Sequence, residues 1–569
     1  MTCKILILGG YGVFGGRLAR ALIKDARFDV VVAGRDERAA RAFCAEHGGR
    51  VCVLDRDNLA LAAEFAAESP TIVVDAAGPF QTYGNDTFKV AAAAIACGAH
   101  YLDLSDDADF TVGIAGLDAA AKARGVAVLS GVSTVPALSS SVVNALTRDL
   151  SPIHLIESAV LPGNRAPRGL SVVRAIVGQA GRPLQLWRDG AAYPVPGWSG
   201  LTALDLEIPG TKPLRARWAS FIGAPDLKLF AQRYGTKSVL FRAGLELKLM
   251  HGGLSLLSGL VSAGLVRTLA PVALPLKWMA DRLEPFGSDR GGMCVRVIGQ
   301  TPNGRFEQRD WTLIAEAGDG PHIPAIPARV MCGKLIGGGV ASGARACLGE
   351  FSLQEAETAL TTLRVSMHRE SRLYLPLFAA ALGEQFERLP AALRDLHSVV
   401  DLRIWKGTAE VARGRGVLSK LAGAIVGFPP SGRDVPVTVT MHRTAGRETW
   451  TRDFGGVKFR STLSAAGPDG SGRIFERFGL LKFTMALAFE NGHLRFPVVA
   501  GSCLGIPLPG FLLPLSETSE FVIADGRAGF DVSISMPVAG LIAHYRGTLS
   551  PADGAAAASS PAAAAQASS

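Results

Sequence analysis

Glycines recur at fixed spacing near the start of the chain, in the segment LGGYGVFGG at residues 8–16. They give the pattern G-x-G-x-x-G, which is typical of a turn that binds the pyrophosphate of a dinucleotide. The first glycine allows a tight turn, the second lets a phosphate approach the backbone, and the third lets the next helix pack on the preceding strand. The alternative is a turn with a structural role alone. The predicted cofactor-binding residues of this turn are Gly10, Tyr11, Gly12, Val13, Phe14 and Gly15.

An arginine stands where the second strand of such a fold would end, in the segment VVVAGRDERA. An acid at this point binds the ribose hydroxyls of NAD, whereas the guanidinium of Arg35 could bind the 2′-phosphate of NADP. We therefore favour NADP, with Asp36 as a ribose ligand and a solvated Arg35 as the alternative that fits NAD. After the third strand, Asp55 is placed to reach the adenine, while Asp57 could cap the next helix.

Small residues follow the fourth predicted strand, in the segment DAAGPFQTYG. Their size allows the ribose and nicotinamide half of a dinucleotide to approach closely. Phe80 and Tyr83 could form the wall of that pocket. The alternative is that they only pack the end of the strand, which would produce the same sequence pattern. The cofactor-binding residues predicted here are Ala76, Ala77, Gly78 and Pro79.

Hydride transfer requires accurate positioning, and a general acid or base can assist it. Asp103 ends the fifth predicted strand, at the edge of the sheet where ligands gather. Tyr83 and Asp103 are the candidate catalytic residues, with Asp106 and Asp107 close by; a capping or loop role for Asp103 is the alternative. The ten histidines and eight cysteines have no metal-ligand spacing, so no metal site is predicted.

Short apolar runs alternate with helical patterns over residues 1–135. Apolar strands separated by helices of 10–20 residues predict a parallel sheet covered on both faces, which is a doubly wound α/β domain of the Rossmann type. Residues 136–325 mix strands and helices and predict an α+β domain for substrate or dimer contacts. Residues 326–365 contain two helical patterns that we expect to pack back on the first domain.

The pattern becomes antiparallel β from residue 371 to 549. Asn491-Gly492 and Asp525-Gly526 lie between alternating strands and predict hairpin turns. A curved sheet here could enclose an apolar ligand near Arg452 and Glu476, but a packed sandwich with a structural Arg/Glu pair is the interpretation we favour from sequence. The Ala/Ser/Pro-rich end, residues 550–569, predicts a disordered tail.

The net charge of +9 is not gathered into a basic cluster with aromatic residues, so nucleic acid is not an expected partner. Scattered cysteines favour a reducing, cytoplasmic location. Residues 252–266 lack charge for only 15 positions, which is short for a membrane span, and residues 252–283 are predominantly apolar. They predict buried or partner-covered helices, or peripheral contact with the inner face of a membrane, with Arg267 and Lys277 at the headgroups.

Five motifs occur in a fixed order: GGYGVFGG, VVAGRD, DAAGPFQTYG, HYLDLSDD and GVSTVPALSS. Together they resemble the saccharopine dehydrogenase-like family of NADP-binding oxidoreductases, over residues 1–365. From residue 371 the chain resembles a separate C-terminal domain of unknown function that is often fused behind such proteins. The resemblance implies a dinucleotide-binding domain followed by a domain for substrate and homodimer contacts. It does not identify the substrate, because members of the family act on unlike molecules.

The expected function is therefore an NADP(H)-dependent oxidoreductase that transfers hydride to or from a small, apolar or lipid-like substrate. Two alternatives stay open at this point. One is a sensor or scaffold that binds the nucleotide without turnover, and the other is a membrane-associated reductase of lipid intermediates.

Overall fold

The structure is a computed structural model that describes residues 2–84, 86–167, 169–537 and 539–552. The chain divides into two compact units. The N-terminal unit comprises residues 1–187 and 192–372, and the C-terminal unit comprises residues 188–191 and 373–569. The disordered tail predicted over residues 550–569 begins too early, because the strand Gly540–Pro551 includes its first two residues; from residue 553 onward it lies outside the described residues.

The first sheet of the N-terminal unit is parallel and has the strand order β15-β6-β5-β4-β1-β2-β3. Its strands are β1 (Cys3–Leu8), β2 (Phe28–Gly34), β3 (Arg50–Val53), β4 (Ile72–Asp75), β5 (His100–Asp103), β6 (Ala127–Ser130) and β15 (Gly343–Ala346). The order from β3 to β6 is that of a Rossmann fold, which confirms the predicted fold class. The direction of winding reverses between β1 and β4, so the carboxyl ends of these strands border a natural ligand site.

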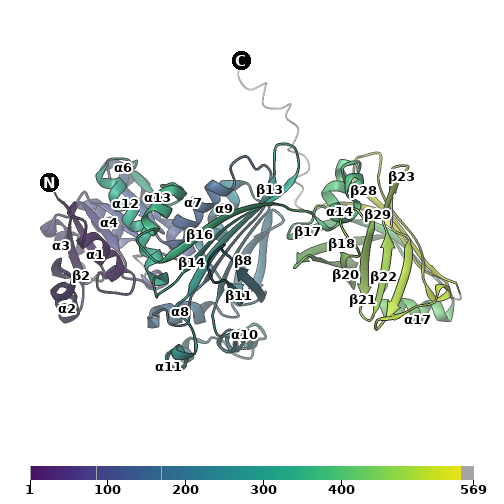
Figure 1. Cartoon of the computed structure of the whole chain (residues 1–569), viewed down its shortest axis with the longest axis horizontal. Coiled ribbons are helices and arrows are strands. Elements are labelled where there is room, and N and C mark those ends of the chain that lie inside the picture. Colours follow the sequence, from purple (N-terminus) through teal and green to yellow (C-terminus); the bar gives the residue numbers. More distant parts are fainter. Residues whose placement is uncertain (1, 85, 168, 538, 553–569) are drawn as a thin grey trace, which may run out of the picture. The chain divides into compact units, whose positions relative to one another are not determined.

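Helices cover both faces of this sheet (Figure 1). They are α1 (Gly15–Ile23), α2 (Glu37–His47), α3 (Leu61–Glu68), α4 (Lys89–Ala96), α5 (Ala108–Gly113), α6 (Asp118–Ala123), α12 (Ile326–Ile336) and α13 (Leu353–Leu360). Phe65 of α3 and Val90 of α4 belong to one buried core, while α12 contacts α1. Because β-α-β crossovers are right-handed, helices before and after the reversal lie on opposite faces.

β15 was not expected from the sequence. Its four residues, GARA, lie between the two predicted helices α12 and α13, and they pair in parallel with β6. Glycine, alanine and arginine have low strand propensity, so only the open edge of β6 explains why this segment is extended.

The second sheet of this unit has the path β10-β11-β12-β7-β13-β14-β16, with β8 and β9 attached through β12. Its strands are β7 (Ile153–Leu161), β8 (Pro183–Arg188), β9 (Ala191–Pro196), β10 (Thr202–Leu206), β11 (Leu214–Phe221), β12 (Ser238–Gly244), β13 (Gly291–Gln300), β14 (Phe306–Ala315) and β16 (Val365–Leu373). Its helices are α7 (Ser139–Leu146), α8 (Leu170–Gln179), α9 (Pro225–Tyr234), α10 (Lys248–Ser262) and α11 (Ala273–Arg282). The mixture of strands and helices agrees with the α+β class predicted for this region.

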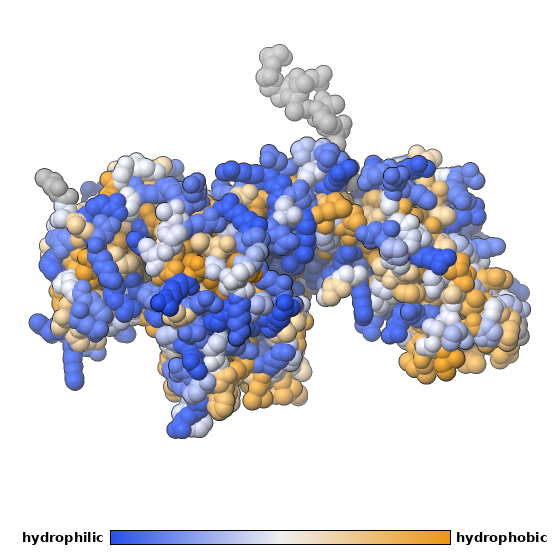
Figure 2. Space-filling model, in the orientation of Figure 1, coloured by the Kyte–Doolittle hydropathy of each residue, from blue (hydrophilic) through white to orange (hydrophobic). Residues whose placement is uncertain are grey.

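α10 and α11 expose much of their apolar surface. His251 and Leu254 of α10 are buried, whereas Leu256 is 69% exposed and Trp278 of α11 is 63% exposed. Figure 2 shows this hydrophobic surface below the second sheet. Among the described residues, no helix combines the length and hydropathy needed to cross a membrane.

The C-terminal unit is built on an antiparallel sheet of 13 strands, in the order β23-β24-β27-β28-β29-β17-β18-β19-β20-β21-β22-β25-β26. The strands are β17 (Leu402–Arg413), β18 (Gly432–Thr444), β19 (Arg447–Phe454), β20 (Val457–Ala465), β21 (Arg473–Phe478), β22 (Leu481–Ala486), β23 (Ala488–Glu490), β24 (His493–Arg495), β25 (Val498–Cys503), β26 (Ile506–Pro507), β27 (Leu515–Val522), β28 (Ala528–Met536) and β29 (Gly540–Pro551). Asn491 and Gly492 both have positive φ and join β23 to β24, as the hairpin prediction requires.

This sheet curls round a core (Figure 1). Its helices are α14 (Leu377–Leu382), α15 (Glu384–Glu387), α16 (Ala391–Leu396) and α17 (Val417–Val426). α14 contacts β20 and β21, and α16 contacts β27 and β28, although these strand pairs are far apart in the sheet order. Phe378 of α14, Trp405 and Trp450 share one buried cluster. The helices α14 and α16 therefore pack against the inner face of the curled sheet.

Candidate dinucleotide-binding site

The turn between β1 and α1 is packed so closely that glycine is required at several positions. A Cβ atom on Gly15 would overlap the carbonyl oxygen of Gly9, and one on Gly10 would lie 2.8 Å from the carbonyl oxygen of Ile7. Gly12 differs, because an added Cβ would meet only the Gly9 carbonyl oxygen, at 3.1 Å, on an otherwise open side. The turn thus presents bare backbone at Gly12, where the sequence predicted phosphate approach.

The tight turn itself is made by Gly9, which corrects the role given to Gly10. Gly9 has φ of 76°, in the region that favours glycine, whereas Gly10 does not. The Gly9 amide donates to the carbonyl oxygen of Ala33, and its carbonyl accepts from the Gly12 amide at 2.9 Å. The signal for Gly9 was present in the sequence as the first glycine of the GGYG run, one residue before the motif begins.

The amino terminus of α1 is suited to bind an anion. Phe14 precedes the helix and supplies no side-chain cap, and the first turn of α1 contains no acidic residue. The first amide groups of a helix carry partial positive charge and lack partners within the helix. A glycine cradle leading into such a terminus fits the pyrophosphate of a dinucleotide.

Tyr11 covers the end of the neighbouring strand β2. Its hydroxyl accepts a hydrogen bond from the Asp36 amide at 2.9 Å, and a Cβ on Gly34 would lie 2.5 Å from that hydroxyl. The Asp36 side chain caps α2 by accepting from the Ala39 amide at 3.0 Å. The carboxylate proposed as an alternative ribose ligand is therefore already engaged with the helix it begins.

Arg35 is exposed beside two other cations at the ends of β2 and β3. The Lys89 ammonium, which contacts the carboxylate of Asp57, lowers the pKa of that group, and Arg56 and Arg35 lower it further. Three cations thus act on one carboxylate, which leaves net positive charge in the loops after β2 and β3.

The alternative role given to Asp57 is wrong, because α3 begins only at Leu61 and Ala60 precedes it. Asp57 instead forms its ion pair with Lys89 at the start of α4. Asp55 accepts a hydrogen bond from the Asp57 amide at 3.0 Å, which shapes the loop after β3.

The segment after β4 is held by a buried carboxylate that the sequence analysis did not select. Asp75 is fully buried, and it accepts hydrogen bonds from the Tyr83 hydroxyl at 2.6 Å and the Ala77 amide at 3.0 Å. Ala76 lies against the turn, where a Cβ on Gly9 would be 2.8 Å from its carbonyl oxygen. Arg56 closes the segment by donating to the Ala77 carbonyl and lying 4.0 Å from the centroid of the Tyr83 ring.

Tyr83 and Phe80 are buried rather than open to a ligand. Their rings stack at 5.2 Å and both contact Phe110 of α5. Burial and the Asp75 carboxylate raise the pKa of the Tyr83 phenol well above its usual range. This geometry favours the alternative of a well-packed strand end for both side chains, with Gly78 and Pro79 forming the link between them and β4.

Asp103 ends β5 directly opposite Asp75 in the strand register. One of its oxygens accepts hydrogen bonds from the Gly131 amide at 2.8 Å, the Ser105 amide at 2.9 Å and the Ser130 hydroxyl at 3.0 Å. The other oxygen, Oδ2, is buried and has no hydrogen-bond partner among the described residues. Burial raises the pKa of Asp103 to about 7, despite the three hydrogen bonds that lower it. The loop role is therefore present, together with a protonation state that changes near neutral pH.

The two remaining acids of this loop have local roles. Asp107 caps α5 by accepting from the Phe110 amide at 2.8 Å, and Asp106 accepts from the Gln81 amide group at 3.3 Å. A third carboxylate, Asp226 in the first turn of α9, was missed from sequence. It is buried, and burial raises its pKa to about 7, although the nearby Ser139 hydroxyl lowers it. No sequence pattern marks it, because α9 reaches α5 only through tertiary packing.

Residues 5–129 match the model of the saccharopine dehydrogenase NADP binding domain. Residues 389–549 match a second model, described as a domain of unknown function (DUF4166). The resemblance drawn from the motifs is confirmed for these two segments. The first match supports a nicotinamide dinucleotide as the cofactor and an oxidoreductase as the class of protein. The comparison with curated proteins finds no match.

Several solved structures are similar to part of this chain. Apo saccharopine dehydrogenase (L-Glu forming) from Saccharomyces cerevisiae is 15% identical, with a TM-score of 0.45, and the alignment covers 65% of this chain and 100% of that one. A protein from gentamicin A biosynthesis in complex with NAD is 16% identical, with a TM-score of 0.31 and coverage of 64% and 96%. Biliverdin reductase from Synechocystis sp. PCC 6803, in complex with biliverdin and NADP+, is 11% identical, with a TM-score of 0.30 and coverage of 63% and 96%.

Proposed function

We propose that the chain is an NADP(H)-dependent oxidoreductase acting on a small, apolar substrate. The observation that carries the proposal is the glycine cradle between β1 and α1, within a segment that matches an NADP binding domain. The residues present fit a dinucleotide, since backbone is bare at Gly12 and the α1 terminus has no competing acid.

The preference for NADP rests on the charges at the ends of β2 and β3. Arg35 is exposed, and the carboxylate of Asp36, which would favour NAD, is used as the cap of α2. A guanidinium can bind a phosphate through a pair of charge-assisted hydrogen bonds. Arg56 and Lys89 add positive charge next to the same loop.

A bound nicotinamide would supply or accept the hydride. The chain's own residues bind the phosphates, set the position of the ring near Ala76, Ala77 and Gly78, and hold protons near it. Asp103 suits the last task, because its pKa of about 7 allows it to gain or lose a proton at neutral pH. Tyr83 is less suitable, because its hydroxyl is buried and committed to Asp75.

Cofactor titration tests this proposal. We expect the wild-type chain to bind NADPH at least about tenfold more tightly than NADH. The Arg35→Ala substitution should weaken the binding of NADPH and leave the binding of NADH unchanged. Arg38→Ala is the matched control, because Arg38 is also exposed and only three residues away on α2. Equal affinity for both cofactors would contradict the NADP assignment. Substrate-dependent oxidation of NADPH, screened with lipid extracts included, separates an enzyme from a nucleotide-binding scaffold.

A second proposal concerns the substrate's setting. We propose peripheral membrane contact through α10 and α11, which is supported by the exposure of Leu256 and Trp278. The fraction of protein that sediments with anionic phosphatidylglycerol vesicles should fall in the Leu256→Asp variant. It should not change in the Leu59→Asp variant, because Leu59 is fully exposed but lies outside α10 and α11. If the wild-type chain instead forms a dimer that Leu256→Asp dissociates, a second copy covers these helices and the membrane proposal fails.

A further inference from the structure

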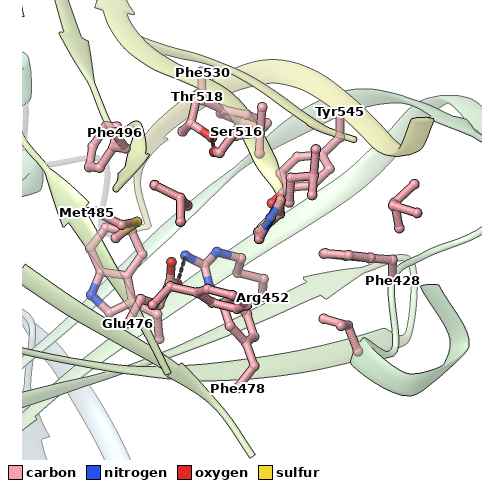
Figure 3. A pocket seen from close by; sticks show the side chains of 18 of the residues that line it. Phe428, Arg452, Glu476, Phe478, Met485, Phe496, Ser516, Thr518, Phe530 and Tyr545 are labelled. Atoms are coloured by element: carbon pink, nitrogen blue, oxygen red, sulfur yellow. Dashed lines mark hydrogen bonds and ion pairs between the residues drawn. The ribbon is translucent and has the colours of Figure 1, made fainter. Parts of the chain in front are cut away.

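The C-terminal unit encloses an apolar cavity of about 410 Å³ inside its curled sheet (Figure 3). This volume lies in the range of roughly 300–1,000 Å³ that is usual for sites of small molecules. Most of the wall is hydrocarbon or aromatic, with side chains from α17 and from strands on both sides of the curl. Representative lining residues are Phe428, Phe478, Met485, Phe496 and Phe530.

Polar side chains interrupt this wall at two main places, which are the hydroxyls of Ser516 and Thr518, 2.8 Å apart on β27, and a charged pair. Arg452 of β19 contacts Glu476 of β21 at 3.3 Å and donates to the Ser461 hydroxyl at 2.9 Å. Tyr545 of β29 is 6% exposed and points toward this pair in Figure 3, and its hydroxyl forms no hydrogen bond among the described residues. Burial raises the pKa of Tyr545 to about 12, so the hydroxyl keeps its proton and can donate to a ligand.

The charges around the cavity are already compensated. Arg452 is neutralised by Glu476, and the other lining carboxylate, Glu520, is hydrogen-bonded to the buried ring of His397. A ligand with its own full charge would be left without a counter-ion in this apolar interior, which is strongly unfavourable. A neutral group that gives and accepts hydrogen bonds meets no such penalty.

The outer surface beside the cavity is also apolar. Ala422 and Val426 of α17 line the cavity, while Val417, Leu418 and Leu421 of the same helix are exposed. Figure 2 shows hydrophobic surface gathered over this end of the C-terminal unit. Such surroundings suit a ligand that is poorly soluble in water.

We propose that the C-terminal unit binds a neutral single-chain lipid. Its hydroxyl or carbonyl group lies between Tyr545 and the Arg452–Glu476 pair, and its hydrocarbon chain lies along the apolar wall. The Arg/Glu pair, interpreted from sequence as structural, thereby becomes the polar end of a binding site. This inference does not depend on the proposed function, because every residue it uses lies in the C-terminal unit.

Binding of defined lipids to the delipidated full-length chain tests the proposal. The probes are hexadecan-1-ol, hexadecanoate at pH 8 and hexadecylammonium, each used to displace a fluorescent dye from the protein. We expect hexadecan-1-ol to bind at least about tenfold more tightly than either charged probe. Among shorter alcohols, affinity should rise about fourfold per added methylene until the cavity is full.

Variants on one strand separate the cavity from nonspecific surface binding. On β28, Val532 lines the cavity, whereas Ser533 is absent from its lining, as the alternation of a strand requires. Val532→Trp should fill the cavity and reduce affinity for hexadecan-1-ol at least about tenfold, with no change on Ser533→Trp. Equal loss in both variants, or in neither, would overturn the cavity as the site.

A paired substitution tests the polar centre without leaving a lone charge. Arg452→Leu combined with Glu476→Leu removes both members of the ion pair. Replacing a buried pair by apolar residues is commonly neutral for folding, so binding can still be measured. The double variant should bind hexadecane and hexadecan-1-ol with similar affinity. The wild-type chain should instead bind hexadecan-1-ol more tightly than hexadecane. Tighter binding of hexadecanoate than of the alcohol by the wild-type chain would refute the neutral head group.

Discussion

Asp103→Asn is expected to remove a pH-dependent loss of stability from the N-terminal unit. The ordinary pKa of the carboxyl is 3.8, and burial raises it to about 7 in the folded chain. Between these values the folded state holds a proton that the unfolded state has released. The free energy of unfolding therefore falls as pH rises from about 4 to about 7, and the stabilising effect of the proton is fully present only below this window.

The size of this effect follows from the shift of about three pKa units. Each unit corresponds to about 1.4 kcal/mol, so burying the ionised carboxylate costs about 4 kcal/mol above pH 7. Asparagine keeps an oxygen to accept from Gly131, Ser105 and Ser130, and its amide group replaces the oxygen that has no partner. Relative to wild type, Asp103→Asn should therefore gain about 2–3 kcal/mol of stability between pH 5 and pH 8.

Urea unfolding at each pH, read by hydrogen exchange of peptides from β5 and β6, measures this difference in the relevant unit. Asp57→Asn is the control, because Lys89 lowers the pKa of Asp57 below 3.8, so this group is ionised in both the folded and the unfolded chain and its stability difference should stay constant from pH 5 to pH 8. A stability difference for Asp103→Asn that stays constant from pH 5 to pH 8 would show that Asp103 does not titrate near pH 7 in the folded chain and would refute the argument.

Three further substitutions test the N-terminal unit. Gly15→Ala should abolish NADPH binding in a titration and lower stability by about 1–3 kcal/mol, because its Cβ would overlap the turn, whereas Gly116→Ala meets no atom within 4 Å and should do neither. Tyr83→Phe should cost about 1–3 kcal/mol in urea unfolding, since Asp75 loses its shortest hydrogen bond; an unchanged midpoint would mean that Asp75 is already satisfied. Ser352→Ala should cost about 1 kcal/mol, because the capping box at the start of α13 is lost; protection of α13 amides that is unaltered in hydrogen exchange would contradict this.

The inner strands of the first sheet were predictable because they are buried on both faces and leave continuous apolar runs in the sequence. The glycine turn was predictable for a related reason, since backbone that must approach closely excludes side chains. The assignment of the turn to Gly10 rather than Gly9 shows the limit of this reasoning. Both residues are glycine, and only the backbone angles distinguish them.

Features that form only when segments distant in the sequence pack together have no pattern in the sequence. Asp226 and Asp103 became buried through the packing of α9, α5 and the strand ends, and burial rather than residue type sets their pKa values. β15 takes its form from the edge it joins. The cavity of the C-terminal unit depends on how far the sheet curls, which alternating residues do not encode. The alternation of apolar and polar residues predicted the strands, but it could not distinguish a filled core from one that contains a cavity.

The position of β15 also sets an order of events during synthesis. Its partner β6 ends at Ser130, but β15 emerges from the ribosome more than 200 residues later, after the whole second sheet except β16. Until then β6 is an open edge with unpaired amides and carbonyls, which can pair with another nascent chain. A chain that stops before residue 343 would keep this edge permanently. The first sheet thus keeps one edge open to aggregation until β15 is made, although its other strands are synthesised before the second sheet.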